Sequence, residues 1–563
     1  MDPIWLQNYP AGVPHSIDPG AYASVAQLIE ESLKKNADQP FSVCMDRWMQ
    51  YRELDQLSER LGAWLQGLGL EAGARVAIML PNVPQFAVTM AAVLRAGYTC
   101  VNVNPLYTAR ELEHQLKDSG ASAIIILENF AHTLSSVLER TPIQQVCITS
   151  LGDLLGPVYG RWIRFAARHL AKMVPAYTLP LAGGRAVTTF PDALALGAQR
   201  SLRPSPATLD SIAFLQYTGG TTGLSKGAIL THRNIIAATL QAEAWFEPAL
   251  ARLPDRRNLH SVAALPLYHI FALTLCLLAI RQGASLSLIP NPRDIAKFVG
   301  VLKKRPFHLL PGVNTLFNAL LQNPQFRALD FSSLCLSQAG GMAASEGTAR
   351  EWKKVTGSTM IEGWGMSETC AIGTNNPVTN PQYTGHIGLP LPGISIAIKD
   401  EQGQNLPLGV PGELCIQGPN VMTGYYNQPQ ETARAFTDDG YLRTGDVGQM
   451  DAQGCVRIID RKKDMILVSG FNVYPNELEN VVSLCPHVVE CAAVGVPDEK
   501  QGEAIKLFVV RSSEQLDEDA LLRYCSENLT GYKRPKFIEF RDALPKTNVG
   551  KILRRELRDT PAP

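Results

Sequence analysis

The feature that most constrains the fold is an alternation between short runs of aliphatic and β-branched residues and longer amphipathic stretches. Between residues 75 and 128 the chain reads RVAIML, QFAVTMAAVLRAG, TCVNVN, ARELEHQLKDSG and SAIIILE in turn. The short runs are typical of buried strands, and the longer ones of helices with one apolar face. Strands that alternate with helices form a largely parallel sheet covered by helices. We therefore predict an α/β fold.

The same rhythm returns after residue 210 with SIAFLQYTGG, SVAALPLYH and SLSLIP, which predicts two stacked subdomains with mixed or parallel sheets. Around residues 400–460 short strands separated by glycines predict a small β unit. From residue 461 a compact stretch of about 100 residues has its own strand and helix pattern. We predict a large domain at 1–460 and a small, mobile α+β domain at 461–563, with a hinge at 460–464.

Length and composition limit the function. A chain of 563 residues is too long for one hydrophobic core, so more than one domain is expected. Lys plus Arg and Asp plus Glu both number 52, so no overall positive charge would attract nucleic acid. The 11 cysteines include no C-x-x-C pair, and the N-terminus has no pattern of a secretory signal. These features predict a reduced, cytoplasmic protein that does not bind nucleic acid.

Residues 262–280 contain no Asp, Glu, Lys or Arg and are nearly long enough to cross a bilayer, which takes ~20 residues. Pro266 and His269 near the start of this segment favour a strand, a turn and a buried helix instead. A membrane span is the alternative.

Residues 161–174, RWIRFAARHLAKMV, form an amphipathic helix on a helical projection. One face carries Arg161, Arg164, Arg168 and Lys172. The opposite face carries Ile163, Ala166, Leu170, Met173 and Val174, with Phe165 as the exception. In one interpretation the cations are solvated and the apolar face packs on the core. In the other, the helix lies on an anionic membrane surface.

A loop rich in Gly and Thr, YTGGTTGLSKG at residues 217–227, follows the apolar run IAFLQ. Glycines let backbone N–H groups turn toward an anion, and hydroxyls and Lys226 add donors and charge. It is not a Walker loop, because Ser225 precedes the lysine and Gly227 follows it. We predict a phosphate-binding loop, and a turn without a ligand is the alternative. The loop comprises Tyr217, Thr218, Gly219, Gly220, Thr221, Thr222, Gly223, Leu224, Ser225, Lys226, Gly227 and Ala228.

Four further motifs follow in order: SQAGGM (337–342), EGWGMSE (362–368), YLRTGD (441–446) with IIDRKKD (458–464), and PKTNVGK (545–551). Together with the loop they resemble the acyl-adenylate-forming superfamily over essentially the whole chain. GYLRTGDVGQMDAQGCVRIIDRKK and VNVNPLYTARELEHQL are most similar to bacterial long-chain fatty acyl-CoA synthetases. The resemblance implies ATP-dependent activation of a long-chain fatty acid to acyl-CoA through acyl-AMP, with Mg²⁺ and coenzyme A.

The resemblance also implies where the nucleotide binds. Glu368, with Thr218, would hold Mg²⁺, because a hard cation prefers charged oxygen ligands. Trp364 stands where the family usually has Tyr, and either ring can stack on adenine. Asp446 would accept the ribose hydroxyls, with Arg461 beside it. The remaining implied ATP-binding residues are Gly340, Gly341, Glu362, Gly363, Gly365, Met366 and Ser367.

Lys551 is the implied catalytic residue of the first step. Attack of a carboxylate on the α-phosphate brings two anions together, and a cation between them lowers the barrier. The resemblance further implies that the small domain turns about Lys463 after this step. The turn would present Gly470 and Phe471 to coenzyme A, with Lys533 and Arg534 as weaker candidates for its phosphates.

An uncharged tunnel for the alkyl chain is expected around Tyr268, His269, Gly312 and Val313, where each buried methylene contributes about 0.8 kcal/mol. His269 would lie near the substrate carboxylate and is counted as catalytic, although a buried structural histidine is an equal alternative.

Three alternatives remain open at this stage. One is a ligase for another carboxylate, another is an enzyme that stops at acyl-AMP, and the third is a non-catalytic fatty-acid binding or uptake module. A phosphotransferase is disfavoured because the loop lacks the Walker hydroxyl. The expected partners are a fatty acid and, peripherally, the cytoplasmic face of the inner membrane. The oligomeric state is open, a homodimer included.

Overall fold

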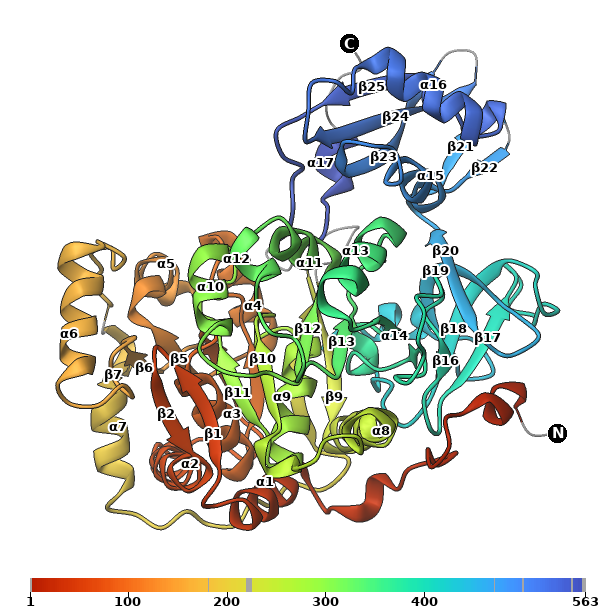
Figure 1. Ribbon diagram of the computed structural model, residues 1–563. Helices are drawn as coiled ribbons and strands as arrows, with labels where there is room; N and C mark the ends of the chain where they lie inside the picture. The colour runs from red at the N-terminus through yellow and green to blue at the C-terminus, as the bar shows by residue number, and fades with distance from the viewer. Residues whose placement is uncertain are drawn as a thin grey trace.

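The computed structural model describes residues 3–180, 182–218, 225–469, 471–498, 501–547 and 550–558, and the strands of this part form four sheets. Three sheets lie in one large body, and the fourth belongs to a small unit above it that is reached through β20 (Figure 1). The predicted α/β fold with a large N-terminal part and a small C-terminal part is confirmed.

The first sheet has seven strands and contains the alternating segments from which the fold was predicted. Its order is β7 (Ala186–Thr189), β6 (Gln145–Thr149), β5 (Ala123–Leu127), β3 (Arg75–Met79), β4 (Thr99–Asn102), β8 (Ile212–Thr218) and β9 (Lys226–Thr231). All neighbours are parallel except β8 and β9, which form an antiparallel hairpin. The ends of the predicted phosphate loop are therefore held next to each other by β8 and β9.

The second sheet has nine strands and is parallel in its centre. Its order is β16 (Leu389–Pro390), β15 (Thr374–Asn375), β14 (Met360–Trp364), β13 (Leu336–Ala339), β12 (Leu309–Gly312), β10 (His260–Ala263), β11 (Ser285–Leu288), β1 (Pro40–Cys44) and β2 (Arg47–Gln50). The strands from β14 to β1 run parallel, and β15, β16 and β2 pair antiparallel at the two ends.

A layer of helices shared by both sheets forms the main hydrophobic core. Its helices are α1 (Val25–Lys35), α2 (Tyr51–Gln66), α3 (Pro84–Arg95), α8 (His232–Leu250) and α9 (Ile270–Gln282). On β3, Val76 and Ile78 face this layer, whereas Ala77 and Met79 face a separate outer cluster. This period of two is expected for strands that are covered on both faces.

Further helices cover the outer faces of the sheets. On the seven-stranded sheet they are α4 (Ala109–Ser119) and α5 (Ala131–Ser135). By contrast, α7 (Phe190–Gly197) packs against α2 and belongs to the main core. On the nine-stranded sheet they are α10 (Ile295–Leu302), α11 (Asn314–Leu321), α12 (Pro324–Arg327) and α13 (Glu346–Thr356).

The uncharged segment 262–280 is the end of β10, a turn and most of α9, as its sequence favoured. Its helix is buried in the layer between the sheets. Within the described ranges, no helix is both long and apolar enough to cross a membrane.

The third sheet is the predicted β unit, with strands in the order β17 (Ser395–Lys399), β18 (Gly412–Gln417), β19 (Leu442–Met450) and β20 (Val456–Arg461), and α14 (Pro429–Ala435) lies beside it. The fourth sheet comprises β21 (Ile466–Val468), β22 (Phe471–Val473), β23 (Val488–Asp498), β24 (Gly502–Arg511) and β25 (Phe537–Phe540). Its helices are α15 (Pro475–Val482), α16 (Glu518–Asn528) and α17 (Arg554–Arg558). The predicted hinge, residues 460–464, spans the last two residues of β20 and the first part of the turn to β21, and its motion stays a prediction.

The basic helix differs from one of its two interpretations. It consists of α6 (Tyr159–Phe165) and a following π-helical turn at Ala166–Leu170. Leu170 and Met173, expected to pack on the core, are exposed, whereas Arg164 and Arg168 pair with carboxylates of the protein body. The interpretation with solvated cations and a packed apolar face holds only in part. Ile163, Ala166 and Val174 are partly buried, and all four cations are exposed, but Arg164 and Arg168 also form ion pairs.

Asn82 joins the two large sheets. Its Nδ2 donates to the carbonyl oxygens of Ala263 and Leu265, both at 2.8 Å, and its Oδ1 accepts from the backbone N–H of Leu267 at 2.8 Å. Asn82 follows β3, and the other three residues lie at the end of β10 or just after it. All three bonds are buried.

We predict that Asn82→Ala lowers the free energy of unfolding by about 2–4 kcal/mol, because it leaves buried backbone groups unpaired. Thermal melting should show an earlier transition. The control is Asn8→Ala, which removes a single exposed bond to the Gln453 carbonyl and should melt like the wild type. Equal melting of both variants would contradict the prediction.

Candidate active site

A cavity of about 550 Å³ lies where the large body meets the small C-terminal unit. β8, β13 and β14 contribute residues at or just after their carboxyl ends, the edge at which open α/β sheets bind ligands. Most of the predicted nucleotide site lines it. These residues are Tyr217, Thr218, Lys226, Gly340, Gly341, Gly363, Trp364, Gly365, Met366, Ser367, Glu368, Arg461 and Lys551.

Part of the predicted phosphate loop, Gly219, Gly220, Thr221, Thr222, Gly223 and Leu224, lies outside the described residues, as does Gly470. The strands on either side of the loop are fixed by polar contacts. The Tyr217 hydroxyl donates to Asp118, and the Ser225 carbonyl accepts from His114 Nε2 at 3.0 Å. The Gly227 carbonyl accepts from Tyr426 N at 2.8 Å. Ala228, next to it, is fully buried.

Lys226, the cation predicted to hold phosphate, points into the cavity and has two partners there. Its ammonium group forms an ion pair with Glu431, and it lies 5.3 Å from the centre of the Tyr425 ring. Thr218 pairs with Lys226 across the hairpin. Lys226 therefore brings its charge to the mouth of the loop, balanced by one carboxylate.

Glu368 lies in a short turn after β14 and is buried at the cavity wall. Its Oε1 accepts a hydrogen bond from the Tyr425 hydroxyl at 2.8 Å, and its backbone carbonyl accepts from Met422 N at 2.7 Å. The turn needs a glycine nearby, because a Cβ at Gly365 would stand 2.3 Å from the Ala371 carbonyl. These contacts hold the carboxylate toward the cavity with oxygen lone pairs to spare.

Asp446 is buried beside the cavity with both carboxylate oxygens bonded. Oδ2 accepts from the Trp364 indole N–H at 2.8 Å, and Oδ1 pairs with Arg461 Nε at 3.0 Å. Asp446 and Arg461 face each other across the β19–β20 pair, so the sheet register sets their distance. A ribose hydroxyl that binds here would use remaining lone pairs or replace the indole.

Lys551 enters the cavity from the small unit on a tight loop. The Thr547 N–H donates to the Lys551 carbonyl at 2.7 Å, and the Lys551 N–H donates to Thr547 Oγ1 at 3.0 Å. The Thr315 hydroxyl of the large body donates to the Gly550 carbonyl at 3.2 Å. The left-handed backbone of Gly550, with φ of 85°, suits only glycine here, since a Cβ would stand 2.7 Å from Thr315 Oγ1. The loop therefore docks on α11.

Burial and, to a smaller extent, the positive charge of Arg461 together lower the pKa of Lys551 to about 8. Asp446 and Glu368 oppose this shift, and Lys463 adds to it. The protein groups around the Lys551 ammonium therefore compensate its charge only in part, as expected for a cation that binds an anionic ligand.

His269 lines the cavity at the N-terminus of α9. Its Nδ1 accepts from Phe271 N at 3.4 Å, so the ring proton is assigned to Nε2. Burial and the nearby Lys551 lower its pKa to about 3, so the ring is neutral. Tyr268, Gly312 and Val313, predicted with it for the tunnel, are not among the described residues that line the cavity. Its apolar lining includes Phe246, Ile270, Phe271, Leu275 and Leu391.

Phe471, Lys533 and Arg534, the described residues among those predicted for coenzyme A, lie on the small unit and outside the cavity lining. Phe471 is exposed, and its ring stacks on Tyr532 with centroids 4.8 Å apart. Lys533 Nζ pairs with Glu477 at 2.6 Å. Arg534 donates to the carbonyls of Leu529 and Ser526 at the end of α16. The structure thus has Lys551 in the cavity and Phe471 on the surface.

Glu362 also lies apart from the cavity lining, although it belongs to the EGWGMSE motif. Its Oε1 accepts from Ala344 N at 2.8 Å, and burial raises its pKa to about 7. It supports the turn after SQAGGM. Tyr425 and Glu431 line the cavity and contact Glu368 and Lys226, but sequence reasoning missed them. The only signal was the polar GYYNQPQET turn after the β unit's second strand, which has no phosphate-loop spacing.

The chain matches two family models. The model of the AMP-binding enzyme family matches residues 29–426, which is more than half of the chain. The chain belongs to the AMP-binding enzyme family. The model of the AMP-binding enzyme C-terminal domain matches residues 477–551, a range that ends at Lys551.

Curated relatives of this AMP-binding enzyme span its whole length. A "Long-chain-fatty-acid–CoA ligase" of Escherichia coli O6:H1 is 50% identical over 99% of this chain and 98% of its own. A protein of the same name from Yersinia pestis is also 50% identical, with the same coverage. A "Feruloyl-CoA synthase" of Amycolatopsis is 32% identical over 90% of this chain and 93% of its own.

Solved structures share the fold. ATP-bound MatB from Rhodopseudomonas palustris has a TM-score of 0.76 and 29% identity over 95% of this chain and 98% of its own. The anthranilate CoA ligase AuaEII with anthranoyl-AMP has a TM-score of 0.83 over 96% and 98% of the two chains. At 24% identity, the second similarity concerns the fold alone.

We predict that this AMP-binding enzyme loses pyrophosphate–ATP exchange as pH rises through about 8, because Lys551 then loses its charge before ATP binds. Lysine usually titrates near 10.4, so the lowered pKa moves the alkaline limb into the measurable range. The kcat/KM for ATP should be recorded against pH. In Lys551→Arg the limb should move beyond pH ~10, because guanidinium stays charged. If the alkaline limb of Lys551→Arg stays near pH 8, the titrating group is not Lys551.

We also predict that Trp364→Phe raises the KM for ATP about fivefold with little change in kcat, because Asp446 loses a bond worth about 1 kcal/mol that orients it. The ring that can stack on adenine is kept. Trp5→Phe, at a remote buried site, is the control. A drop confined to kcat would show that the indole acts on the reaction rather than on nucleotide binding.

Proposed function

We propose that this enzyme activates long-chain fatty acids with ATP and coenzyme A, forms an acyl-AMP intermediate and releases AMP and pyrophosphate. The observation that carries the proposal is the meeting of Lys551, Glu368 and Thr218 in one cavity whose apolar lining includes residues of α9. Full-length relatives with 50% identity and the name of long-chain-fatty-acid–CoA ligases support the choice of substrate.

In the first step, a carboxylate oxygen of the fatty acid attacks the α-phosphorus of ATP, and the bond to pyrophosphate breaks. The Lys551 ammonium group would lie between the two anions and offset their repulsion. His269, neutral with its proton assigned to Nε2, would donate to the carboxylate and orient it. Both side chains line the same cavity, as this step requires.

Glu368 and the Thr218 hydroxyl fit Mg²⁺ bound together with ATP. One carboxylate and one hydroxyl leave most positions of an octahedral cation to water and phosphate oxygens, as is usual for Mg²⁺ at nucleotides. The ion would neutralise charge on the phosphates. The Tyr425 hydroxyl would keep the Glu368 carboxylate turned toward the cavity.

In the second step, the thiol sulfur of coenzyme A attacks the acyl carbon, the carbon–oxygen bond to AMP breaks, and the thiol proton leaves to solvent. We propose that the small domain turns about Lys463, which withdraws Lys551 and brings the loop of Gly470 and Phe471 to the cavity. The exposed Phe471–Tyr532 stack and Lys533 would then meet the pantetheine arm and phosphates.

Three other functions can be distinguished from this one by experiment. A ligase for another carboxylate is favoured by the relative named feruloyl-CoA synthase, and an enzyme that stops at acyl-AMP would release no thioester. A fatty-acid binding or uptake module would bind oleate but would not need Lys551. We propose cytoplasmic action in fatty-acid degradation, at the inner membrane where fatty acids enter, and leave open a homodimer.

We predict that Lys551→Ala lowers pyrophosphate–ATP exchange with oleate by roughly a thousandfold, because the cation acts in adenylation. Thioester formation from supplied oleoyl-AMP and coenzyme A should persist. Lys546→Ala, which removes a lysine of the same loop that pairs with Glu490 at 2.9 Å, is the matched control and should keep exchange. Full exchange by Lys551→Ala would favour the binding-module alternative.

Substrate choice is tested by pyrophosphate release with acetate, octanoate, palmitate, oleate and ferulate. We predict that kcat/KM rises up to fourfold per added methylene, the equivalent of about 0.8 kcal/mol, until the tunnel is filled. A maximum at ferulate or acetate would contradict the proposed substrate class.

A further inference from the structure

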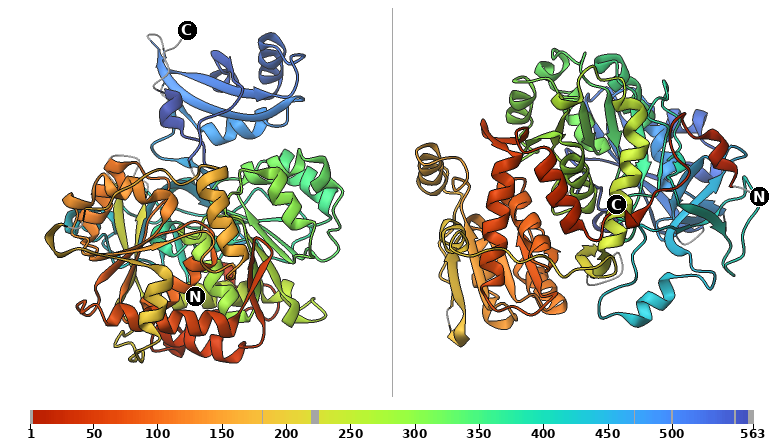
Figure 2. Two further views of the ribbon diagram at one scale, coloured as in Figure 1. Left: turned by 90° about the vertical axis from the view of Figure 1, so that its left-hand side faces the viewer. Right: turned by 90° about the horizontal axis from the view of Figure 1, so that it is seen from below.

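The segment of residues 158–173 lies at the outer edge of the seven-stranded sheet, beside β7 (Figures 1 and 2). It exposes an unusual amount of apolar surface. Large apolar side chains there are between 43% and 75% exposed. They are Val158, Tyr159, Trp162, Phe165, Leu170 and Met173. We call them the apolar face of α6. A surface helix ordinarily turns such a face toward the core.

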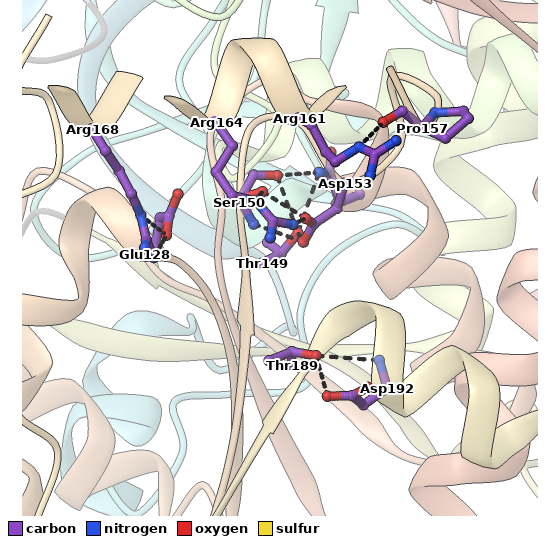
Figure 3. Close-up of polar contacts among 11 residues, drawn as sticks. Glu128, Thr149, Ser150, Asp153, Pro157, Arg161, Arg164, Arg168, Thr189 and Asp192 are labelled. Carbon is purple, nitrogen blue, oxygen red and sulfur yellow. Dashed lines mark hydrogen bonds and ion pairs between the residues drawn. The ribbon is translucent and has the colours of Figure 1, made fainter. Parts of the chain in front are cut away.

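Arg164 and Arg168 tie the helix to the protein body in this orientation. Arg164 forms an ion pair with Asp153 and donates from Nε to Ser150 Oγ at 3.1 Å (Figure 3). Arg168 donates from Nε to Glu128 Oε2 at 3.1 Å and pairs with the same oxygen through Nη2.

Both carboxylates are anchored in the protein body. The side chains of Asp153 and Glu128 are 2% and 4% exposed, and they lie just after β6 and β5. Asp153 also accepts from Ser150 N at 2.8 Å and from Thr149 Oγ1 at 2.9 Å. A helix rolled with its apolar face inward would leave two buried carboxylates without their cations, which is costly.

The position of the helix is fixed as well as its roll. Gly152 and Gly160 are in close backbone contact, since a Cβ on Gly152 would stand 2.0 Å from the Gly160 carbonyl oxygen. Asn129 Nδ2 donates to the Met173 carbonyl at 3.0 Å at the other end of the segment. The exposed apolar face is therefore a built feature of the fold.

The charge around the apolar face selects its partner. From residue 154 to residue 191 the chain has no Asp or Glu, while it has Arg161, Arg164, Arg168, Lys172 and Arg185. Arg161 and Lys172 are exposed and have no carboxylate partner among the described residues. Arg161 donates from Nε to the Pro157 carbonyl at 2.7 Å. Apolar and aromatic side chains flanked by free cations match the interface of an anionic bilayer.

We propose that the apolar face of α6 docks the enzyme on an anionic lipid surface, with Trp162 and Phe165 inserted at the level of the headgroups and Arg161 and Lys172 against lipid phosphates. The inference rests on the proposed function only in the reason it gives for docking, namely that long-chain fatty acids partition into membranes. Docking itself requires no catalysis, so the two can fail separately.

The test is sedimentation of the full-length protein with vesicles of phosphatidylethanolamine and phosphatidylglycerol, and with vesicles of phosphatidylcholine alone. Trp162→Ser with Phe165→Ser should lower binding to the anionic vesicles by about tenfold or more. Leu408→Ser with Val410→Ser removes two exposed apolar residues from the turn between β17 and β18 and should bind like the wild type.

The cations are tested separately, because Arg164 and Arg168 also hold the helix. Arg161→Gln with Lys172→Gln should remove the preference for anionic over neutral vesicles and leave the melting temperature unchanged. Unchanged vesicle binding by the Trp162, Phe165 double variant would overturn the proposal. So would a concentration-dependent oligomer in sedimentation velocity that this variant abolishes, because the face would then bind a second copy of the chain.

Discussion

The candidate active site depends on one cation that is held where protein groups only partly compensate its charge. Lys551 reaches the cavity because Gly550 and Thr547 fold its loop tightly and Thr315 docks that loop on the large body. Burial lowers its pKa to about 8, against the pull of Asp446 and Glu368. A bound polyphosphate would supply the missing negative charge. On the proposed function, we therefore expect bound nucleotide to favour the position of the small domain that places Lys551 in the cavity.

The alternation of strands and helices predicted much of the fold, because burial on both faces leaves a clear period in the sequence. β3, α3, β4, α4 and β5 follow the predicted order. The orientation of α6 could not be predicted in the same way. A helical projection shows which residues share a face. It does not show that carboxylates of other segments, Asp153 and Glu128, pair with the arginines of this helix. Those two ion pairs fix the segment with several large apolar side chains at the surface.

The candidate site likewise contains residues that the sequence could indicate and residues that it could not. Glu368, Asp446 and Lys551 stand in short motifs that resemble those of the acyl-adenylate-forming superfamily, so the resemblance could point to them. Tyr425 and Glu431 reach the cavity only through the packing of the segment around α14, and no local spacing marks them. The contact of Trp364 with Asp446 likewise joins β14 to β19. Trp364 stands where the family usually has Tyr, which looks like a conservative replacement in the sequence. In the structure its indole N–H bonds directly to Asp446, the residue expected to hold ribose.

The central claim is that the Lys551 ammonium group meets the α-phosphate of ATP while the large domain holds the nucleotide. A crystal structure of the enzyme with Mg²⁺ and α,β-methylene ATP measures this directly. The account predicts Lys551 Nζ within about 3 Å of an α-phosphonate oxygen, with adenine at Trp364 and ribose at Asp446. A nucleotide bound at Trp364 and Asp446 with Lys551 still in the cavity but turned to another partner would contradict it.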